Sequence, residues 1–218
     1  MSTLRVKICG LTQSNQAIAI AQLGATTLGF IAVPKSPRYI APDDLRSLAQ
    51  TLITESPQTQ RVGVFANADL KTITKFQISG KLTGIQLHGD ETLEDCQRVR
   101  DHLPDVEIIK AIRVKDQTSL EHALEYAPVV DALLLDAYRP GILGGTGATL
   151  DWAALTAFQP ACPWLLAGGL RPDNICQALQ HITPDGIDLS SGVERSPGDK
   201  DIEKVTQLFE QLRYLEVL

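Results

Sequence analysis

The chain has 218 residues, 44% hydrophobic and 21% charged, so it can bury a full core and is neither a disordered nor a coiled-coil sequence. Its 20 basic and 26 acidic residues give a net charge of −6, which argues against nucleic acid as a partner but leaves room for local binding of a small phosphate. The four cysteines form no CxxC pair and no apolar run reaches 18 residues, so we expect a soluble cytoplasmic protein without disulfides, metal or membrane span.

Eight short apolar or β-branched runs recur along the chain, and each is predicted to be a strand. These runs span residues 4–9, 27–33, 61–66, 83–88, 106–113, 130–136, 164–168 and 186–190. Each is followed by a segment of helical period, several of which begin with a helix-start signal such as Asp69 or Pro42. The predicted helices span residues 13–23, 45–53, 70–78, 91–102, 116–126, 151–158, 172–181 and 199–212.

This alternation is typical of βα units around a parallel sheet. Eight units of about 27 residues each have room for a strand, a helix and two short loops, but not for a second domain or a fused enzyme. An open doubly wound sheet is the alternative, yet such sheets usually carry five or six strands, so the count of eight favours closure. We therefore predict an α/β fold, a single-domain (β/α)8 TIM barrel over residues 1–218.

Two reactive side chains end predicted strands, and in these barrels the carboxyl ends of the strands hold the active site. Cys9 ends the first strand, and a lone strand cysteine is also commonly a small buried apolar group. Alternation places Lys7 on the same face, where its ammonium would favour a thiolate unless a barrel carboxylate pairs with it. Asp136 ends the sixth, buried strand, so it is either a loop cap or an acid of raised pKa suited to proton donation.

Glycines and serines follow the seventh and eighth predicted strands, where barrels commonly hold a phosphate. The residues are Gly168 and Gly169 after the seventh strand, and Ser190, Ser191 and Gly192 after the eighth. Each segment alone is ordinary turn chemistry. Their occurrence in adjacent units favours a phosphate site, because glycine lets backbone amides approach an anion.

The remaining candidates come from other loops at the same end of the barrel. Arg38 is either a solvated arginine or the group that holds a carboxylate with two hydrogen bonds. His88 is either a substrate contact or a histidine satisfied by its neighbours. Gly144, Gly145 and Gly147 follow the sixth strand and form either a flexible connection or a mobile loop that closes over substrate.

Seven segments at these positions are recognisable as an ordered set. They are residues 6–12 (VKICGLT), 29–40, 62–65 (VGVF), 86–89 (QLHG), 135–152, 167–170 (AGGL) and 188–194 (DLSSGVE). Together they closely resemble the phosphoribosylanthranilate isomerase family of tryptophan biosynthesis, and the resemblance runs from end to end of the chain.

The resemblance implies a cofactor-free and metal-free Amadori rearrangement of a small phosphorylated substrate. N-(5-phosphoribosyl)anthranilate would become 1-(2-carboxyphenylamino)-1-deoxyribulose 5-phosphate, with Cys9 as general base and Asp136 as general acid. Arg38 would hold the anthranilate carboxylate, and the glycines and serines after the last two strands would hold the phosphate. His88 and Asp188 are predicted as further substrate contacts. Residues 137–139 are where loop contacts known from the family are least transferable to this sequence.

Two other functions remain as alternatives. A Schiff-base aldolase or lyase would use Lys110 as its nucleophile, although this lysine lies three residues before Arg113 rather than at the end of its strand. The second alternative is a phosphate-binding barrel without enzymatic activity, and no feature of the sequence favours it. Whether the chain is a monomer or a homodimer is left open.

Overall fold

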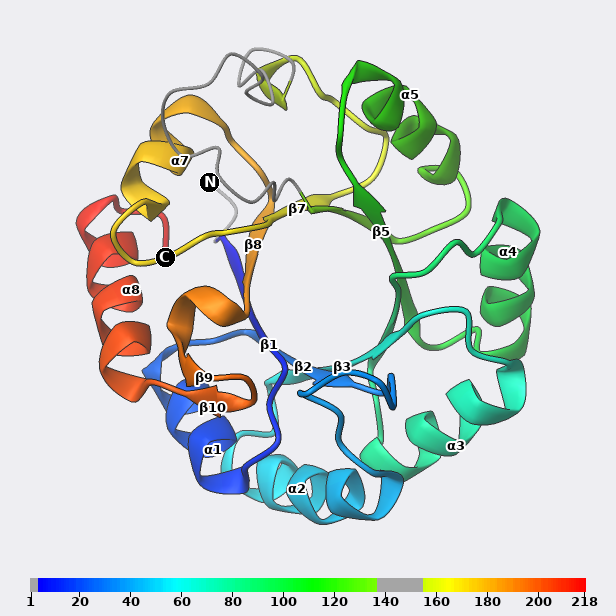
Figure 1. The fold of residues 1–218 in the computed structure, drawn as a ribbon, viewed down its shortest axis with the longest axis horizontal. Coiled ribbons are helices and arrows are strands. Elements are labelled where there is room, and N and C mark those ends of the chain that lie inside the picture. Colours follow the sequence, from blue (N-terminus) through cyan, green and yellow to red (C-terminus); the bar gives the residue numbers. More distant parts are fainter. Residues whose placement is uncertain (1–3, 137–154) are drawn as a thin grey trace.

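The computed structural model describes residues 4–136 and 155–218, in which eight parallel strands form a closed barrel in the order β1 to β8, the inner ring of Figure 1. The strands are β1 (Arg5–Cys9), β2 (Thr27–Ile31), β3 (Gln60–Phe65), β4 (Gly84–Leu87), β5 (Glu107–Arg113), β6 (Ala132–Asp136), β7 (Trp164–Ala167) and β8 (Gly186–Leu189). Closure comes from β8 pairing with β1, with Gly186 opposite Arg5. The predicted (β/α)8 barrel is confirmed.

Helices surround this ring on the outside, as Figure 1 shows. The described residues contain α1 (Ser14–Leu23), α2 (Pro42–Glu55), α3 (Leu70–Gly80), α4 (Leu93–His102), α5 (Gln117–Tyr126), α7 (Ile175–His181) and α8 (Ile202–Tyr214). The helix predicted at 151–158 begins outside the described residues. Within residues 4–136 and 155–218, no helix is long and apolar enough to cross a membrane.

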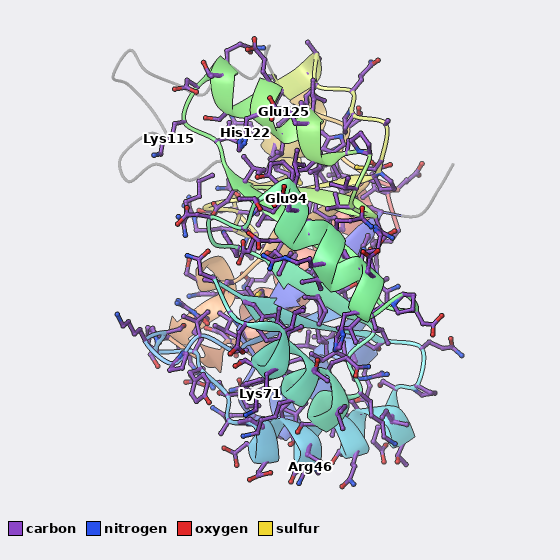
Figure 2. The ribbon with its side chains drawn as sticks, turned by 90° about the vertical axis from the view of Figure 1, so that its right-hand side faces the viewer. Arg46, Lys71, Glu94, Lys115, His122 and Glu125 are labelled. Carbon is purple, nitrogen blue, oxygen red and sulfur yellow. The ribbon has the colours of Figure 1, made fainter. Side chains whose placement is uncertain are left out.

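The outer faces of the helices carry polar and charged side chains, as a barrel surrounded by amphipathic helices requires. Figure 2 labels exposed side chains of this kind on α2 to α5 and on the loop before α5. They are Arg46, Lys71, Glu94, Lys115, His122 and Glu125.

Side-chain caps set the starts of several helices. Asp69 accepts a hydrogen bond from the N–H of Thr72 at the start of α3, and Asp116 caps α5 in the same way. The helix predicted from residue 91 begins two residues later, because Thr92 forms a capping box at its start. Glu91 therefore lies before α4 and is free to enter the interior of the fold, where it is 7% exposed.

A short hairpin replaces the start of the last predicted helix. Residues 199–212 were expected to be helical, but β10 (Asp199–Lys200) pairs antiparallel with β9 (Glu194–Ser196), and α8 begins only after Asp201, its cap. Gly198 has a φ of 83°, a left-handed conformation that reverses the chain between the two strands. The hairpin lies beside β1 and α1 in Figure 1.

The sheet separates two apolar layers. On β6, Leu133 and Leu135 belong to the large cluster between sheet and helices, whereas Ala132 and Leu134 belong to a smaller one. Because side chains alternate along a strand, the smaller cluster is the filling of the barrel interior. Its members are Val62, Ile109, Ala111, Ala132, Leu134, Leu165 and Ala167. Polar side chains on the inward face are consequently exceptions that require an explanation.

Candidate active site

A cavity of about 280 Å³ opens where the strands end. Its lining includes every predicted site residue in the part of the chain that the structure describes. These are Cys9, Arg38, His88, Asp136, Gly168, Gly169, Asp188, Ser190, Ser191 and Gly192. The predicted mobile-loop residues, Gly144, Gly145 and Gly147, lie outside the described residues. Barrel closure thus brings together positions that are far apart in the sequence.

Lys7 points into the barrel beneath Cys9 and is completely buried. Its Nζ donates a hydrogen bond to Asp188 Oδ1 over 2.9 Å. Of the two arrangements that the sequence left open for Lys7, pairing with a carboxylate of the barrel is therefore the one observed. Burial alone would lower the pKa of Lys7, but Asp188 and the neighbouring Cys9 outweigh it and hold that pKa above its ordinary value. The ammonium is therefore a permanent charge at the base of the cavity.

The Cys9 thiol is 5% exposed, and burial raises its pKa above the ordinary value even though Lys7 pulls the other way. Lys7 thus favours the thiolate, as expected, but desolvation is the larger influence, and the charge of Asp188 also raises the pKa. Gly29 lies opposite Cys9 in the sheet, and a Cβ there would lie 2.7 Å from Sγ. The Cys9 sulfur therefore occupies space that is available only because position 29 is a glycine.

Asp136 ends β6, and its side chain is 29% exposed. It lies next to His88, which directly follows β4. The nearest atoms, His88 Nε2 and Asp136 Oδ2, are 3.5 Å apart, too far for a strong hydrogen bond. Gln86 Nε2 lies 3.1 Å from His88 Nδ1. When the Gln86 amide donates there, neutral His88 carries its proton on Nε2 and presents an N–H toward Asp136.

Arg38 reaches over the cavity and is oriented by Glu194, a residue that the sequence reasoning did not assign. Arg38 Nε and Nη2 both donate to the Glu194 carboxylate, at 2.9 and 2.7 Å for the shorter contacts. Glu194 also accepts from the buried Lys200 Nζ at 2.7 Å. Burial would raise the pKa of Glu194, but hydrogen bonds from Arg38 and Lys200 outweigh it and hold that pKa below its ordinary value. Glu194 is thus an ionised anchor between two cations.

We expect the Glu194→Gln variant to be less stable by about 3 to 5 kcal/mol, because it leaves the Lys200 ammonium buried without a counter-charge. Thermal unfolding followed by circular dichroism should show a Tm lower by roughly 10 °C. Glu210→Gln, at an exposed position of α8, is the matched control and should unfold with the wild type. Unfolding of Glu194→Gln at the wild-type temperature would contradict the anchoring role.

The glycine-rich ends of β7 and β8 pack directly against each other. Gly168 and Gly169 have positive φ angles of 96° and 65°, which side chains rarely tolerate. A Cβ at Gly192 would lie 1.9 Å from the carbonyl oxygen of Leu170. Asn174 donates to the Gly169 carbonyl over 3.0 Å, and this loop contact delays α7 to Ile175 instead of the predicted 172. Both loops therefore present compact backbone to the cavity.

Lys110, the nucleophile of the alternative lyase, faces away from the cavity. Its strand neighbours Ile108 and Ile112 pack in the layer between sheet and helices, so alternation turns Lys110 in the same direction. Lys110 Nζ is 2.7 Å from Glu91 Oε2 and donates to the Gly89 carbonyl over 2.9 Å. A paired, helix-facing ammonium does not fit a Schiff-base role.

Sequence reasoning missed three polar residues that shape the site. Gln86 precedes His88 by two positions, so the alternation argument used for Lys7 and Cys9 would have found it. Glu194 and Lys200 had no comparable signal, because the sequence predicts a helix at Lys200 and no element at Glu194, whereas the structure pairs them in a hairpin.

Comparison with known proteins identifies the family of this chain. The family described as "N-(5'phosphoribosyl)anthranilate (PRA) isomerase" matches residues 6–211. The N-(5'-phosphoribosyl)anthranilate isomerase of Synechococcus elongatus is 60% identical over 209 residues, 96% of either chain. That of Acaryochloris marina is 52% identical over 217 residues, covering 98% of this chain and 100% of the relative.

Solved structures of the same family share the fold. Phosphoribosyl anthranilate isomerase from Thermotoga maritima superposes with a TM-score of 0.85 at 34% identity, covering 97% of this chain and 99% of that one. An isomerase solved in complex with reduced 1-(o-carboxyphenylamino)-1-deoxyribulose 5-phosphate has a TM-score of 0.82 at 32% identity, with the same coverage. The chain therefore belongs to the N-(5'-phosphoribosyl)anthranilate isomerase family.

Proposed function

We propose that this chain catalyses the Amadori rearrangement of N-(5'-phosphoribosyl)anthranilate to 1-(2-carboxyphenylamino)-1-deoxyribulose 5-phosphate, with Cys9 as general base and Asp136 as general acid. The reaction is a step of tryptophan biosynthesis. The observation that carries the proposal is that a thiol, a carboxyl group, an arginine and two glycine-rich loops line one cavity. Each matches one chemical part of this substrate.

The two anionic ends of the substrate would set its direction in the cavity. Arg38 would receive the anthranilate carboxylate, since Glu194 binds its Nε and Nη2 and so fixes the plane of the guanidinium. Backbone of Gly168, Gly169 and the 190–192 segment would receive the phosphate. The sugar would then lie between Cys9 and Asp136, with His88 and Asp188 as further contacts.

Ring opening would come first. Asp136 gives its proton to the ring oxygen, the bond from that oxygen to C1 breaks, and the nitrogen lone pair forms an iminium at C1. This step requires the acid form of Asp136. His88 Nε2 lies 3.5 Å from Asp136 Oδ2, in the same region of the cavity.

Proton removal would follow, because the iminium acidifies the C–H bond at C2. The Cys9 thiolate takes that proton, and the electron pair of the broken bond forms the C1–C2 double bond of an enolamine. Loss of the C2 hydroxyl proton and gain of a proton at C1 then give the ketone. Burial disfavours the thiolate, and the Lys7 ammonium is the charge that does most to stabilise it.

The activity is tested with purified protein and phosphoribosylanthranilate, whose fluorescence disappears as it is converted. We expect turnover without any added cofactor and unchanged after dialysis against EDTA, since the family resemblance implies neither cofactor nor metal. Within the described residues, no group of three His, Cys, Asp or Glu side chains is arranged to hold a metal ion. Failure of the wild-type protein to convert the substrate would overturn the proposal.

The Gly192→Ala variant should bind the phosphorylated substrate more weakly. Its new methyl group would collide with the Leu170 carbonyl and separate the two loops. We expect KM to rise about 10- to 100-fold, the scale of a small misplacement at a binding site. The dephosphorylated reduced product is the control ligand, because it should bind both proteins alike. Equal KM values for variant and wild type would contradict the placement of the phosphate.

We also propose that residues 1–218 act as one barrel domain in the cytoplasm, on a small phosphorylated substrate and without nucleic acid. Light scattering after size exclusion distinguishes a monomer from a homodimer.

A further inference from the structure

Gln86 is a buried polar residue on the inward face of β4, among side chains that are mostly apolar. It is 1% exposed and lines the active-site cavity, whereas its neighbours Ile85 and Leu87 pack toward the helices. One end of its amide is used, since Nε2 lies 3.1 Å from His88 Nδ1. Among residues 4–136 and 155–218, its Oε1 is the one buried side-chain polar atom that has no hydrogen-bond partner.

An unpartnered buried oxygen of this kind is costly. Leaving a buried acceptor unsatisfied costs about 1 to 3 kcal/mol, and native proteins satisfy the great majority of such groups. Leucine or methionine in this position would fill a similar volume without that cost. The arrangement is therefore explained when a ligand in the cavity supplies the missing donor.

The chemistry of the substrate limits which of its groups can be that donor. Gln86 Oε1 only accepts hydrogen bonds, so the carboxylate and the phosphate, which are themselves acceptors, do not suit it. The substrate carries two kinds of donor, the hydroxyls of the pentose and the N–H of the anthranilate. His88, which Gln86 contacts, lies beside Asp136, where the sugar ring opens under the proposed function. The hydroxyls lie on the sugar that opens there, and they outnumber the single N–H.

We propose that Gln86 is a substrate-binding and positioning residue. Its Oε1 accepts a hydrogen bond from one pentose hydroxyl, and its Nε2 holds His88 in the tautomer that carries the proton on Nε2. Gln86 thereby couples recognition of the sugar to the orientation of the histidine beside Asp136. This inference rests on the proposed function, because the sugar is taken from that substrate.

The first test is a set of binding measurements by titration calorimetry. The ligands are reduced 1-(o-carboxyphenylamino)-1-deoxyribulose 5-phosphate and its analogues that lack one sugar hydroxyl each. We expect the wild type to bind one deoxy analogue about 10-fold more weakly than the parent, the scale of one hydrogen bond. Gln86→Leu should bind the parent about 10-fold more weakly and should not distinguish it from that analogue.

The second test separates the two ends of the amide. Gln86→Glu keeps an acceptor in place of Oε1 but replaces the Nε2 donor with an acceptor, so it should still distinguish the deoxy analogue while moving the His88 proton to Nδ1. Nitrogen-15 NMR of labelled histidine reports the tautomer, and the signal missing from His88→Asn assigns it among the four histidines. Gln86→Glu also keeps the proposal testable if Gln86→Leu folds poorly.

Gln97→Leu, at an exposed position of α4, is the matched control and should behave as the wild type. If Gln86→Leu distinguishes the deoxy analogues as the wild type does, the hydroxyl contact is wrong. If His88 keeps one tautomer in all variants, the positioning role is wrong. A wild-type protein that neither binds the parent ligand nor converts the substrate would instead overturn the proposed function.

Discussion

The Cys9→Ala variant is expected to turn over substrate about 100- to 10,000-fold more slowly than the wild type, the range that a general base contributes. The loss should appear in kcat, with little change in KM, because the alanine removes the sulfur without touching Arg38 or the glycine-rich loops. Fold and stability should be largely retained, since the side chain is small and lies at the mouth of the barrel. The measurement is the decay of phosphoribosylanthranilate fluorescence at saturating substrate.

The pH profile gives an independent check on Cys9. A general base works as the thiolate, so kcat/KM should fall as the pH decreases below the Cys9 pKa. Since burial raises that pKa above its ordinary value, the rate should still be rising with pH through the neutral range. The rise should be absent from the residual activity of Cys9→Ala. Cys162→Ala, a cysteine outside this cavity, should keep the wild-type rate and profile, and near-normal turnover by Cys9→Ala would rule out the thiolate base.

The Asp136→Asn variant should lose activity on the same scale, about 100- to 10,000-fold in kcat, because an amide occupies the same space but has no acidic proton to give to the ring oxygen. Substrate binding should change little, since the proposed carboxylate and phosphate contacts lie on Arg38 and on the loops after β7 and β8. The measurement is again the decay of phosphoribosylanthranilate fluorescence at saturating substrate.

Asp131→Asn is the matched control for this substitution. Asp131 directly precedes β6, at the end of the strand opposite to Asp136, and it is not among the residues that line the cavity. It accepts a hydrogen bond from the Ile108 N–H over 2.7 Å. Its asparagine variant can still accept that bond and should turn over substrate as the wild type does. An Asp136→Asn enzyme with comparable turnover would remove Asp136 from the acid role and leave His88 as the nearest candidate donor.

Much of the fold could be predicted because its signals are local. Each strand is a short apolar run, and helix caps such as Asp69 and Asp116 act within three residues of themselves. Once eight units were counted, the general rule that barrel sites lie at the carboxyl ends of strands selected Cys9 and Asp136. The hairpin of β9 and β10 was not predicted, because its strands are short and directly precede a genuine helix, α8.

The charged contacts could not be predicted in the same way. Lys7 pairs with Asp188 and Arg38 with Glu194, across 181 and 156 positions of the chain. Which carboxylate meets which cation depends on barrel closure and on the reversal at Gly198, and neither is written in a local pattern. Lys110 is a similar case, since the apolar residues on both faces of its strand left its direction open, and only the assembled barrel turned it toward the helices.

By itself, the sequence determined the βα architecture and the set of residues gathered at the barrel mouth, because periodicity and strand ends are properties of neighbouring residues. Only the tertiary structure decided the electrostatic state of that mouth. Desolvation and pairing depend on what surrounds a group in space, so burial raised the Cys9 pKa against the pull of Lys7, and only closure of the barrel left Gln86 Oε1 without a partner.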